Sequence, residues 1–252
     1  MHALPPSQID LIERLAAAAW PAEQIDYRGG WRLRTSSAPN RRVNSVLPLA
    51  PAADGPIGQR IGEVETFYRD RDRPPRFQMS PAAEPGELDA MLAARGYGIE
   101  APVVVQCAGI EGIAAASVTG QAHFDHHADP PWLATCWPDG TIEDMAARRA
   151  LLARIRPEHC FALVSREGEP AAVGLGVLEA EWLGIFCMRT ASRHRRKGAA
   201  QAVLTVLARW AGERGARAAY LQVESENLPA LGLYEKAGFR TAYGYHYRTL
   251  KA

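Results

Sequence analysis

The sequence lacks the features that would place it in a membrane or in an oxidising compartment. No apolar run in its 252 residues is long enough to cross a bilayer, and its N-terminus has no signal-peptide pattern. The four cysteines form no CxxC pair and lie far apart, at Cys107, Cys136, Cys160 and Cys187. We therefore expect a cytoplasmic protein with reduced thiols and no membrane partner.

The chain also lacks an excess of charge of either sign. Its 29 basic and 28 acidic residues give a formal net charge of +1, and no basic stripe extends beyond residues 193–197. A protein whose main partner is nucleic acid carries a larger basic surface, so we expect no such partner. Apolar residues make up 47% of the chain, which is enough for a substantial core in one large domain or two small ones.

The two common nucleotide-binding signatures, GxGxxG and GxxxxGK[ST], are absent. The sequence has a different turn instead, which reads RHRRKGAA over residues 193–200. An apolar run at 185–188 precedes it, and apolar residues recur every three or four positions from Val203 to Ala211. This order predicts a strand, a tight basic turn and a helix. The unpaired N–H groups of a helix N-terminus bind anions, and Gly198 leaves room for a diphosphate to approach them.

Two motifs in register resemble those of the GNAT acyl-CoA-dependent N-acetyltransferases. Arg195-x-x-Gly198-x-Ala200 has the pattern [Gln/Arg]-x-x-Gly-x-[Gly/Ala] with which that family holds the CoA pyrophosphate. The downstream positions Asn227, Tyr234 and Gly238-Phe239 resemble the family's pattern after its fifth strand. The resemblance covers residues 160–250. It implies an α/β fold with a mixed sheet, acetyl-CoA as the acyl donor, and no metal.

The resemblance also implies roles for individual residues. The residues that would hold the diphosphate are Arg195, Arg196, Lys197, Gly198, Ala199 and Ala200. In the family, the strand entering the turn splays from its neighbour and offers backbone groups to the pantetheine and the acetyl carbonyl, here at Met188, Arg189 and Thr190. Asn227 would cap a helix and bond the pantetheine arm. Tyr234 stands where the family places the tyrosine that faces the thiolate, which makes it the expected general acid.

The general base stays open at this point. Some members of the family use a glutamate on the strand before the turn, but that position falls here near Leu183 or Gly184, and neither can act as a base. The remaining candidates are four carboxylates near strand ends: Glu224, Glu226, Glu179 and Glu181. An amine that is already neutral would need no strong base.

The acceptor side is less specific. In the family, the first pair of helices forms one wall of the acceptor pocket, so Trp132 and Trp137 are candidate substrate-binding residues, with packing in the core as an equal alternative. The cluster of histidines at 123–127 has no spacing that directs the imidazoles toward one point, and we expect solvated side chains rather than a metal site. The expected acceptor is a small-molecule or peptide amine, and a homodimer is possible.

The N-terminal half repeats an order of elements found in the C-terminal half. Strand, helix, strand, helix and strand follow one another from residue 43 and again from residue 184, and the helix end at 92–97 parallels the one at 234–239. The stretch GGWRLR…RRVNS resembles the N-terminal portion of a tandem-type subset of GNAT proteins. We therefore predict a degenerate GNAT-like lobe over residues 1–110, packed on a catalytic GNAT domain over 111–252. The first copy lacks the glycine turn, so we expect structural support from it and no CoA binding.

Together these features predict an acyltransferase that moves an acetyl group from acetyl-CoA to a primary amine by direct attack in a ternary complex. Such transfer needs a polarised carbonyl, a neutral amine and a stabilised leaving thiolate. The alternative is a non-catalytic acyl-CoA-binding sensor or interaction module with the same fold. The intact turn and Tyr234 favour the enzyme, whereas the missing strand carboxylate keeps the alternative open.

Overall fold

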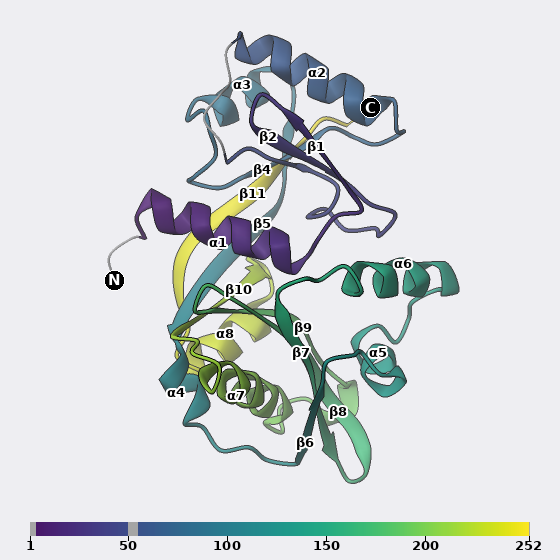
Figure 1. The fold of residues 1–252 in the computed structure, drawn as a ribbon, viewed down its shortest axis with the longest axis vertical. Coiled ribbons are helices and arrows are strands. Elements are labelled where there is room, and N and C mark those ends of the chain that lie inside the picture. Colours follow the sequence, from purple (N-terminus) through teal and green to yellow (C-terminus); the bar gives the residue numbers. More distant parts are fainter. Residues whose placement is uncertain (1–3, 50–54, 252) are drawn as a thin grey trace. The chain divides into compact units, whose positions relative to one another are not determined.

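The computed structural model describes residues 4–49 and 55–251 (Figure 1). The chain forms two compact units, one of residues up to Val104 together with those from Tyr243 onward, and one of Val105–Ala242. It passes between them inside β5 (Gly98–Gly109) and again inside β11 (Arg240–Thr249). This division differs from the predicted lobes mainly in residues 243–252, which belong to the first unit.

The first unit places helices on both faces of a sheet with strand order β1-β2-β3-β4-β11. Its elements are α1 (Pro6–Ala19), β1 (Gln24–Arg28), β2 (Trp31–Thr35), β3 (Val46–Leu47), α2 (Ile57–Arg69), β4 (Arg76–Met79) and α3 (Leu88–Ala94). Phe77 and Met79 pack in one core with residues of α2 and α3. Gln78 alternates with them and bonds Glu13 of α1, so α1 covers the opposite face.

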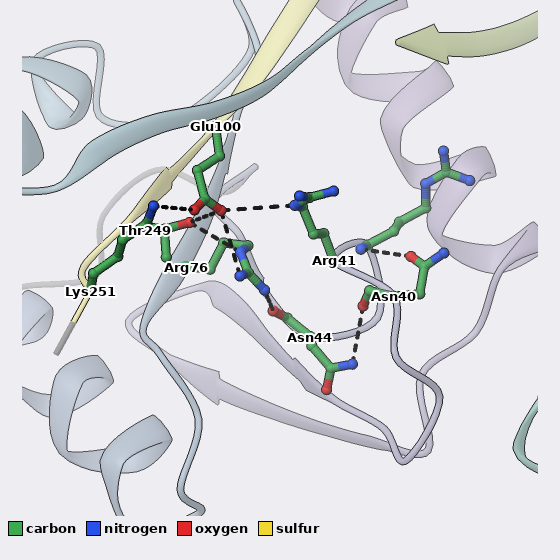
Figure 2. Close-up of polar contacts among 8 residues, drawn as sticks. Asn40, Arg41, Asn44, Arg76, Glu100, Thr249 and Lys251 are labelled. Carbon is green, nitrogen blue, oxygen red and sulfur yellow. Dashed lines mark hydrogen bonds and ion pairs between the residues drawn. The ribbon is translucent and has the colours of Figure 1, made fainter. Parts of the chain in front are cut away.

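Ion pairs hold the loop at residues 40–44 inside this unit (Figure 2). The Glu100 carboxylate lies 3.6 Å from the Arg76 guanidinium and 3.8 Å from that of Arg41, and it accepts a hydrogen bond of 3.0 Å from Thr249. Partial burial opposes ionisation of Glu100, but Thr249, Lys251 and Arg76 outweigh it and keep its pKa below the usual value. The contacts join the loop to β4, β5 and β11 within one unit.

The second unit has the strand order β10-β9-β8-β7-β6. Its elements are α4 (Ile110–Ala114), β6 (Gln121–Asp125), α5 (Pro130–Cys136), α6 (Ile142–Leu152), β7 (Glu158–Arg166), β8 (Glu169–Glu179), β9 (Trp182–Thr190), the 3₁₀ turn η1 (Ser192–His194), α7 (Ala199–Gly212), β10 (Ala218–Glu224) and α8 (Leu228–Lys236). β9 and β10 pair in parallel, whereas the pairs from β6 to β9 are antiparallel.

Two helices cover opposite faces of this sheet (Figure 1). Gly174 and Gly176 of β8 face α7, because a Cβ on either would meet Leu207 at 3.3 or 3.0 Å. Phe161 of β7 lies on the other face, where its ring meets that of Trp132 on α5 at 5.1 Å. The sheet therefore separates an α7 side from an α5 side.

The predicted order of elements in the two halves is confirmed, and the helix ends match in detail. Gly96 and Gly238 both have left-handed φ values, of 86° and 95°. The next residue in each case donates its N–H to the carbonyl five residues back, at 3.1 Å for Tyr97 and 2.9 Å for Phe239. The pattern did not predict β1, α4 or β6. Part of the loop at 50–56 lies outside the described residues.

Candidate functional site

The predicted phosphate turn has the backbone geometry of an anion-binding helix N-terminus. α7 begins at Ala199, and its N-cap residue Gly198 has φ 81° and ψ 0°, a left-handed conformation that suits glycine. No side chain of the described residues caps this helix. Its first N–H groups are therefore available to an anion.

Charged side chains surround the turn. Arg195, Arg196 and Lys197 are exposed, whereas His194 is buried beneath them. Arg193 forms an ion pair of 2.8 Å with Glu169, the first residue of β8. This ion pair fixes the start of the turn against the β7–β8 hairpin. The basic residues at 195–197 therefore lie close to the start of α7.

Two residues beside Gly198 were missed by the sequence analysis. A Cβ at Gly198 would lie 3.5 Å from Thr119 Oγ1 and 3.7 Å from Arg166 Nη2, and Arg166 donates a hydrogen bond of 2.5 Å to Thr119. The Arg166 Nε is buried and has no hydrogen-bond partner among the described residues. Arg166 thus adds a cation beside the N-terminus of α7. It precedes the turn by about thirty residues in the printed sequence, so no local spacing signals it.

The loop that carries Thr119 is fixed by two contacts. Gly120 has φ 102°, and a Cβ on it would lie 2.7 Å from the Ser165 carbonyl oxygen, so only glycine permits this close approach. Arg209 of α7 donates hydrogen bonds of 2.9 Å to the carbonyls of Ala114 and Ala116. Together they hold the loop against the start of α7.

β9 leaves its ladder with β10 before either strand ends. The paired residues run from Trp182–Ala218 to Ile185–Leu221, whereas β9 continues to Thr190 and β10 to Glu224. The predicted backbone positions Met188, Arg189 and Thr190 lie on the part of β9 that has no partner in β10, although Arg189 and Thr190 still pair with β8. An opening between two strands exposes N–H and C=O groups that a ligand can bind.

A β-bulge lies at the start of the opening. Val173 of β8 pairs with Arg189 and Leu175 pairs with Phe186, so Gly174 faces two residues, Cys187 and Met188. Cys187 has φ 53°, in the left-handed region. Such a bulge removes one residue from the ladder and turns its backbone groups outward.

The predicted cap and acid lie on α8. The Asn227 Oδ1 accepts a hydrogen bond of 3.2 Å from the Ala230 N–H, so Asn227 is the N-cap of this helix. Tyr234 is 7% exposed, and burial raises its pKa to about 12. The phenol is therefore protonated at neutral pH and can donate a proton or hydrogen bond.

The candidate bases lie at opposite ends of the sheet. Glu224 is the exposed last residue of β10, and continuing the β9–β10 register places it level with Met188. Glu181 lies before β9 and pairs with Arg217 at 3.1 Å. A strand rises by roughly 3.3 Å per residue, so Glu181 and Glu179 are roughly 20 Å or more from Met188 along β9. Among the candidates, Glu224 is thus better placed than Glu179 or Glu181.

The two tryptophans occupy different environments. Trp132 is 1% exposed, and its indole N–H donates to the carbonyls of Ala162 and Gly174 at 3.1 and 3.2 Å. Trp137 is half-buried, with the Arg148 guanidinium 4.9 Å from its ring centroid. Trp132 therefore packs in the core on the α5 side of the sheet.

A pocket of about 310 Å³ lies between α5 and the end of β9. Neither tryptophan lines it. The lining residues are Pro131, Ala134, Thr135, Pro138, Pro170, Arg189, Thr190, Ala191, Ser192 and Arg193. Because Arg189 and Thr190 belong to the part of β9 that has no partner in β10, the pocket adjoins the opening between these two strands.

The histidine cluster is exposed at all three positions, His123, His126 and His127. Within residues 4–49 and 55–251, no three His, Cys, Asp or Glu side chains gather in a way that could hold a metal ion. Across the same residues, none of the helices has the length and apolar character needed to cross a membrane.

Comparison with known proteins decides the family. Residues 6–248 match the family model described as "Probable histone acetyltransferase Rv0428c C-terminal". The chain belongs to the GNAT family of N-acetyltransferases. A GNAT relative from Bacillus subtilis, "Uncharacterized N-acetyltransferase YobR", is 31% identical over 94% of this chain and 96% of its own length. The chain is accordingly an acetyltransferase of the GNAT type.

Solved GNAT structures share the fold over nearly the whole chain. A GCN5-related N-acetyltransferase from Kribbella flavida superposes with a TM-score of 0.72 and 13% identity, covering 96% of this chain and 95% of its own. A tandem GNAT protein from the clavulanic acid biosynthesis pathway gives a TM-score of 0.65 and 14% identity over 99% and 89% of the two chains. At these identities the likeness concerns the fold, and it confirms the predicted mixed α/β architecture.

Proposed function

We propose that this GNAT protein transfers an acetyl group from acetyl-CoA to a primary amine by direct attack in a ternary complex. One observation carries the proposal: β9 leaves its ladder with β10, and η1 and the basic turn then connect its end to helix α7, whose N-cap is Gly198. A diphosphate at the turn and a pantetheine chain along the opening would then be continuous. The residues present fit this donor.

The turn would bind the two phosphates. Backbone N–H groups at Gly198, Ala199 and Ala200 supply donors that need no rearrangement, and Arg195, Arg196 and Lys197 add positive charge. Arg166 extends this set from the β7–β8 hairpin. Asn227 would bond the pantetheine arm from the start of α8 while it caps that helix.

The end of β9, which has no partner in β10, would polarise the acyl carbonyl. Main-chain groups at Met188, Arg189 and Thr190 would orient the thioester and stabilise negative charge on its oxygen. A preorganised donor of this kind is worth about 2.7–4 kcal/mol in acyl transfer. The bulge leaves Cys187 and Met188 without partners in the β8–β9 ladder, and none of the three residues has a partner in the β9–β10 ladder.

Two side chains would move protons. Tyr234, protonated at neutral pH, would donate to the departing thiolate. Glu224, level with Met188 on the other strand, would accept a proton from the amine, directly or through water. The tryptophans have a lesser part in this proposal, because Trp132 is buried, although Trp137 could still contact an acceptor. The first unit, including residues 1–104, would act as structural support without a donor site.

The rival function is a sensor that binds acyl-CoA without turnover. It is favoured by one observation, the absence of a carboxylate at Leu183 and Gly184. Thiol release from acetyl-CoA with a panel of primary amines separates the two. We expect release above the rate of hydrolysis, with intersecting double-reciprocal lines that indicate a ternary complex. Tight CoA binding by calorimetry with no release for any amine would refute the enzyme in favour of the sensor.

A further inference from the structure

We infer that the pocket between α5 and β9 binds the acceptor, and that this acceptor is a small amine that also carries a carboxylate, held by the Arg189 guanidinium. The inference rests on the proposed function and names the substrate class for the same site.

The pocket combines apolar walls with positive charge. Proline and alanine side chains of α5 and of the β7–β8 hairpin form the walls, and Thr135 and Ser192 add hydroxyl groups. Among the described residues, no carboxylate lines it, and its two charged lining residues are Arg189 and Arg193. Arg193 is already paired with Glu169 at 2.8 Å. Arg189 is exposed and forms no ion pair within the described part of the chain, so its charge is left for a ligand.

The strand directs Arg189 to the acceptor side. Met188 faces α7, since its sulfur would lie 2.7 Å from a Cβ at Gly174, on the face that α7 covers. Successive residues of a strand point to opposite faces, so Arg189 points to the α5 side, where the pocket lies. The main chain of the same residues is the proposed site of the acyl carbonyl. A carboxylate on Arg189 would therefore stand a few bonds from the reacting amine.

Charge and size then select among amines. A guanidinium binds a carboxylate through two parallel hydrogen bonds, whereas a polyamine or a lysine-rich peptide would meet Arg189 and the basic turn with like charge. A volume of about 310 Å³ is at the lower end for small-molecule pockets, which suits a molecule the size of an amino acid. This class differs from the histone named in the description of the matching family model.

Matched acceptors test the inference. For each amino acid, kcat/KM would be compared with that of its amide and of its decarboxylated amine, in the wild type, Arg189→Gln and Arg217→Gln. Arg217 is a matched control, because it is an exposed arginine paired with Glu181 in the turn before β9. We expect the wild type and Arg217→Gln to prefer the carboxylate by about tenfold or more, the worth of one charge-assisted hydrogen bond. Arg189→Gln should lose the preference.

A binding measurement makes the test independent of turnover. Calorimetry of the amino acid against protein saturated with CoA should show at least about tenfold weaker binding to Arg189→Gln. Arg189 is exposed, so the variant should fold, and a thermal melt checks this.

Three results would overturn the assignment while leaving the acetyltransferase intact. They are a wild-type preference for polyamines or amides, an unchanged preference in Arg189→Gln, and a raised KM for acetyl-CoA as the sole effect of that variant. Absence of thiol release with every amine would overturn the proposed function instead. In that case, arginine-dependent binding of amino acids would still support the pocket, and no binding would refute it.

Discussion

Replacing Gly198 by alanine should weaken CoA binding through the backbone alone. Gly198 has φ 81°, and a methyl group there would meet its nearest neighbours at 3.5 and 3.7 Å, which is ordinary contact. The substitution therefore causes no clash. Its cost is the left-handed conformation, about 1–2 kcal/mol for a residue with a Cβ. If residue 198 of the variant leaves the left-handed conformation in the free protein, CoA binding must restore that conformation. The Kd for CoA should then rise by about 5- to 30-fold.

Gly215 supplies a matched control at the other end of the same helix. It has φ 91°, and no atom of the described residues lies within 4 Å of a Cβ there, so Gly215→Ala should carry the same conformational cost. Urea unfolding should show a similar loss of stability in both variants if both keep their backbone. Calorimetry should show weaker CoA binding for Gly198→Ala alone, with Gly198→Asn in between because asparagine tolerates the left-handed region better. A Gly198→Ala protein that loses no stability in urea, which indicates a relaxed turn, and still binds CoA as tightly as the wild type would refute the main-chain cradle.

Three further predictions concern other parts of the chain. Tyr234→Phe should lower kcat by about 100-fold or more with little change in CoA affinity. The pKa of Tyr234 is about 12 in the folded protein, whereas the same phenol ionises near pH 10 in the unfolded chain. Between pH 10 and 12 the wild type should therefore lose up to about 2–3 kcal/mol of folding stability relative to Tyr234→Phe. Equal pH profiles of the two proteins in urea unfolding would contradict this. Arg166→Ala should weaken binding of CoA but not of pantetheine, and equal calorimetric losses for both ligands would rule out a phosphate contact. The fragment 111–252 should be insoluble or inactive, because Tyr243, Tyr245 and Tyr247 are buried within the first unit; a soluble, active fragment would oppose this.

The sequence was most informative where the site is contiguous in the chain. Strand, turn and helix from 182 to 212 follow one another directly, so periodicity and one glycine are enough to predict them. The cap at Asn227 is likewise local, since its partner Ala230 lies three residues away. Local hydrogen bonds of this kind depend on residue type and spacing, which a single sequence displays.

The remaining features depend on contacts between distant segments. Arg166 reaches the turn only because β7 and β8 form a hairpin, and Arg189 faces the pocket only because a bulge and the α5 packing fix its direction. Periodicity also leaves the orientation of a short helix undetermined. α5 turns Trp132, Leu133 and Cys136 inward, so its outer residues line the pocket in place of the predicted tryptophan. Tertiary packing determines which face of such a helix is buried.

The two halves of the chain show why architecture alone does not define this site. β3, α2, β4 and α3 repeat the order of β9, α7, β10 and α8. The difference lies at the first residue before the helix. Pro56, with φ −63°, precedes α2 in an extended conformation, whereas Gly198 turns left-handed before α7. A proline cannot adopt that turn, so α2 has no backbone cradle at the corresponding point. Binding of the acyl donor should therefore depend on the conformation of the residue that precedes the helix. The order of elements that both halves share does not by itself create the donor site.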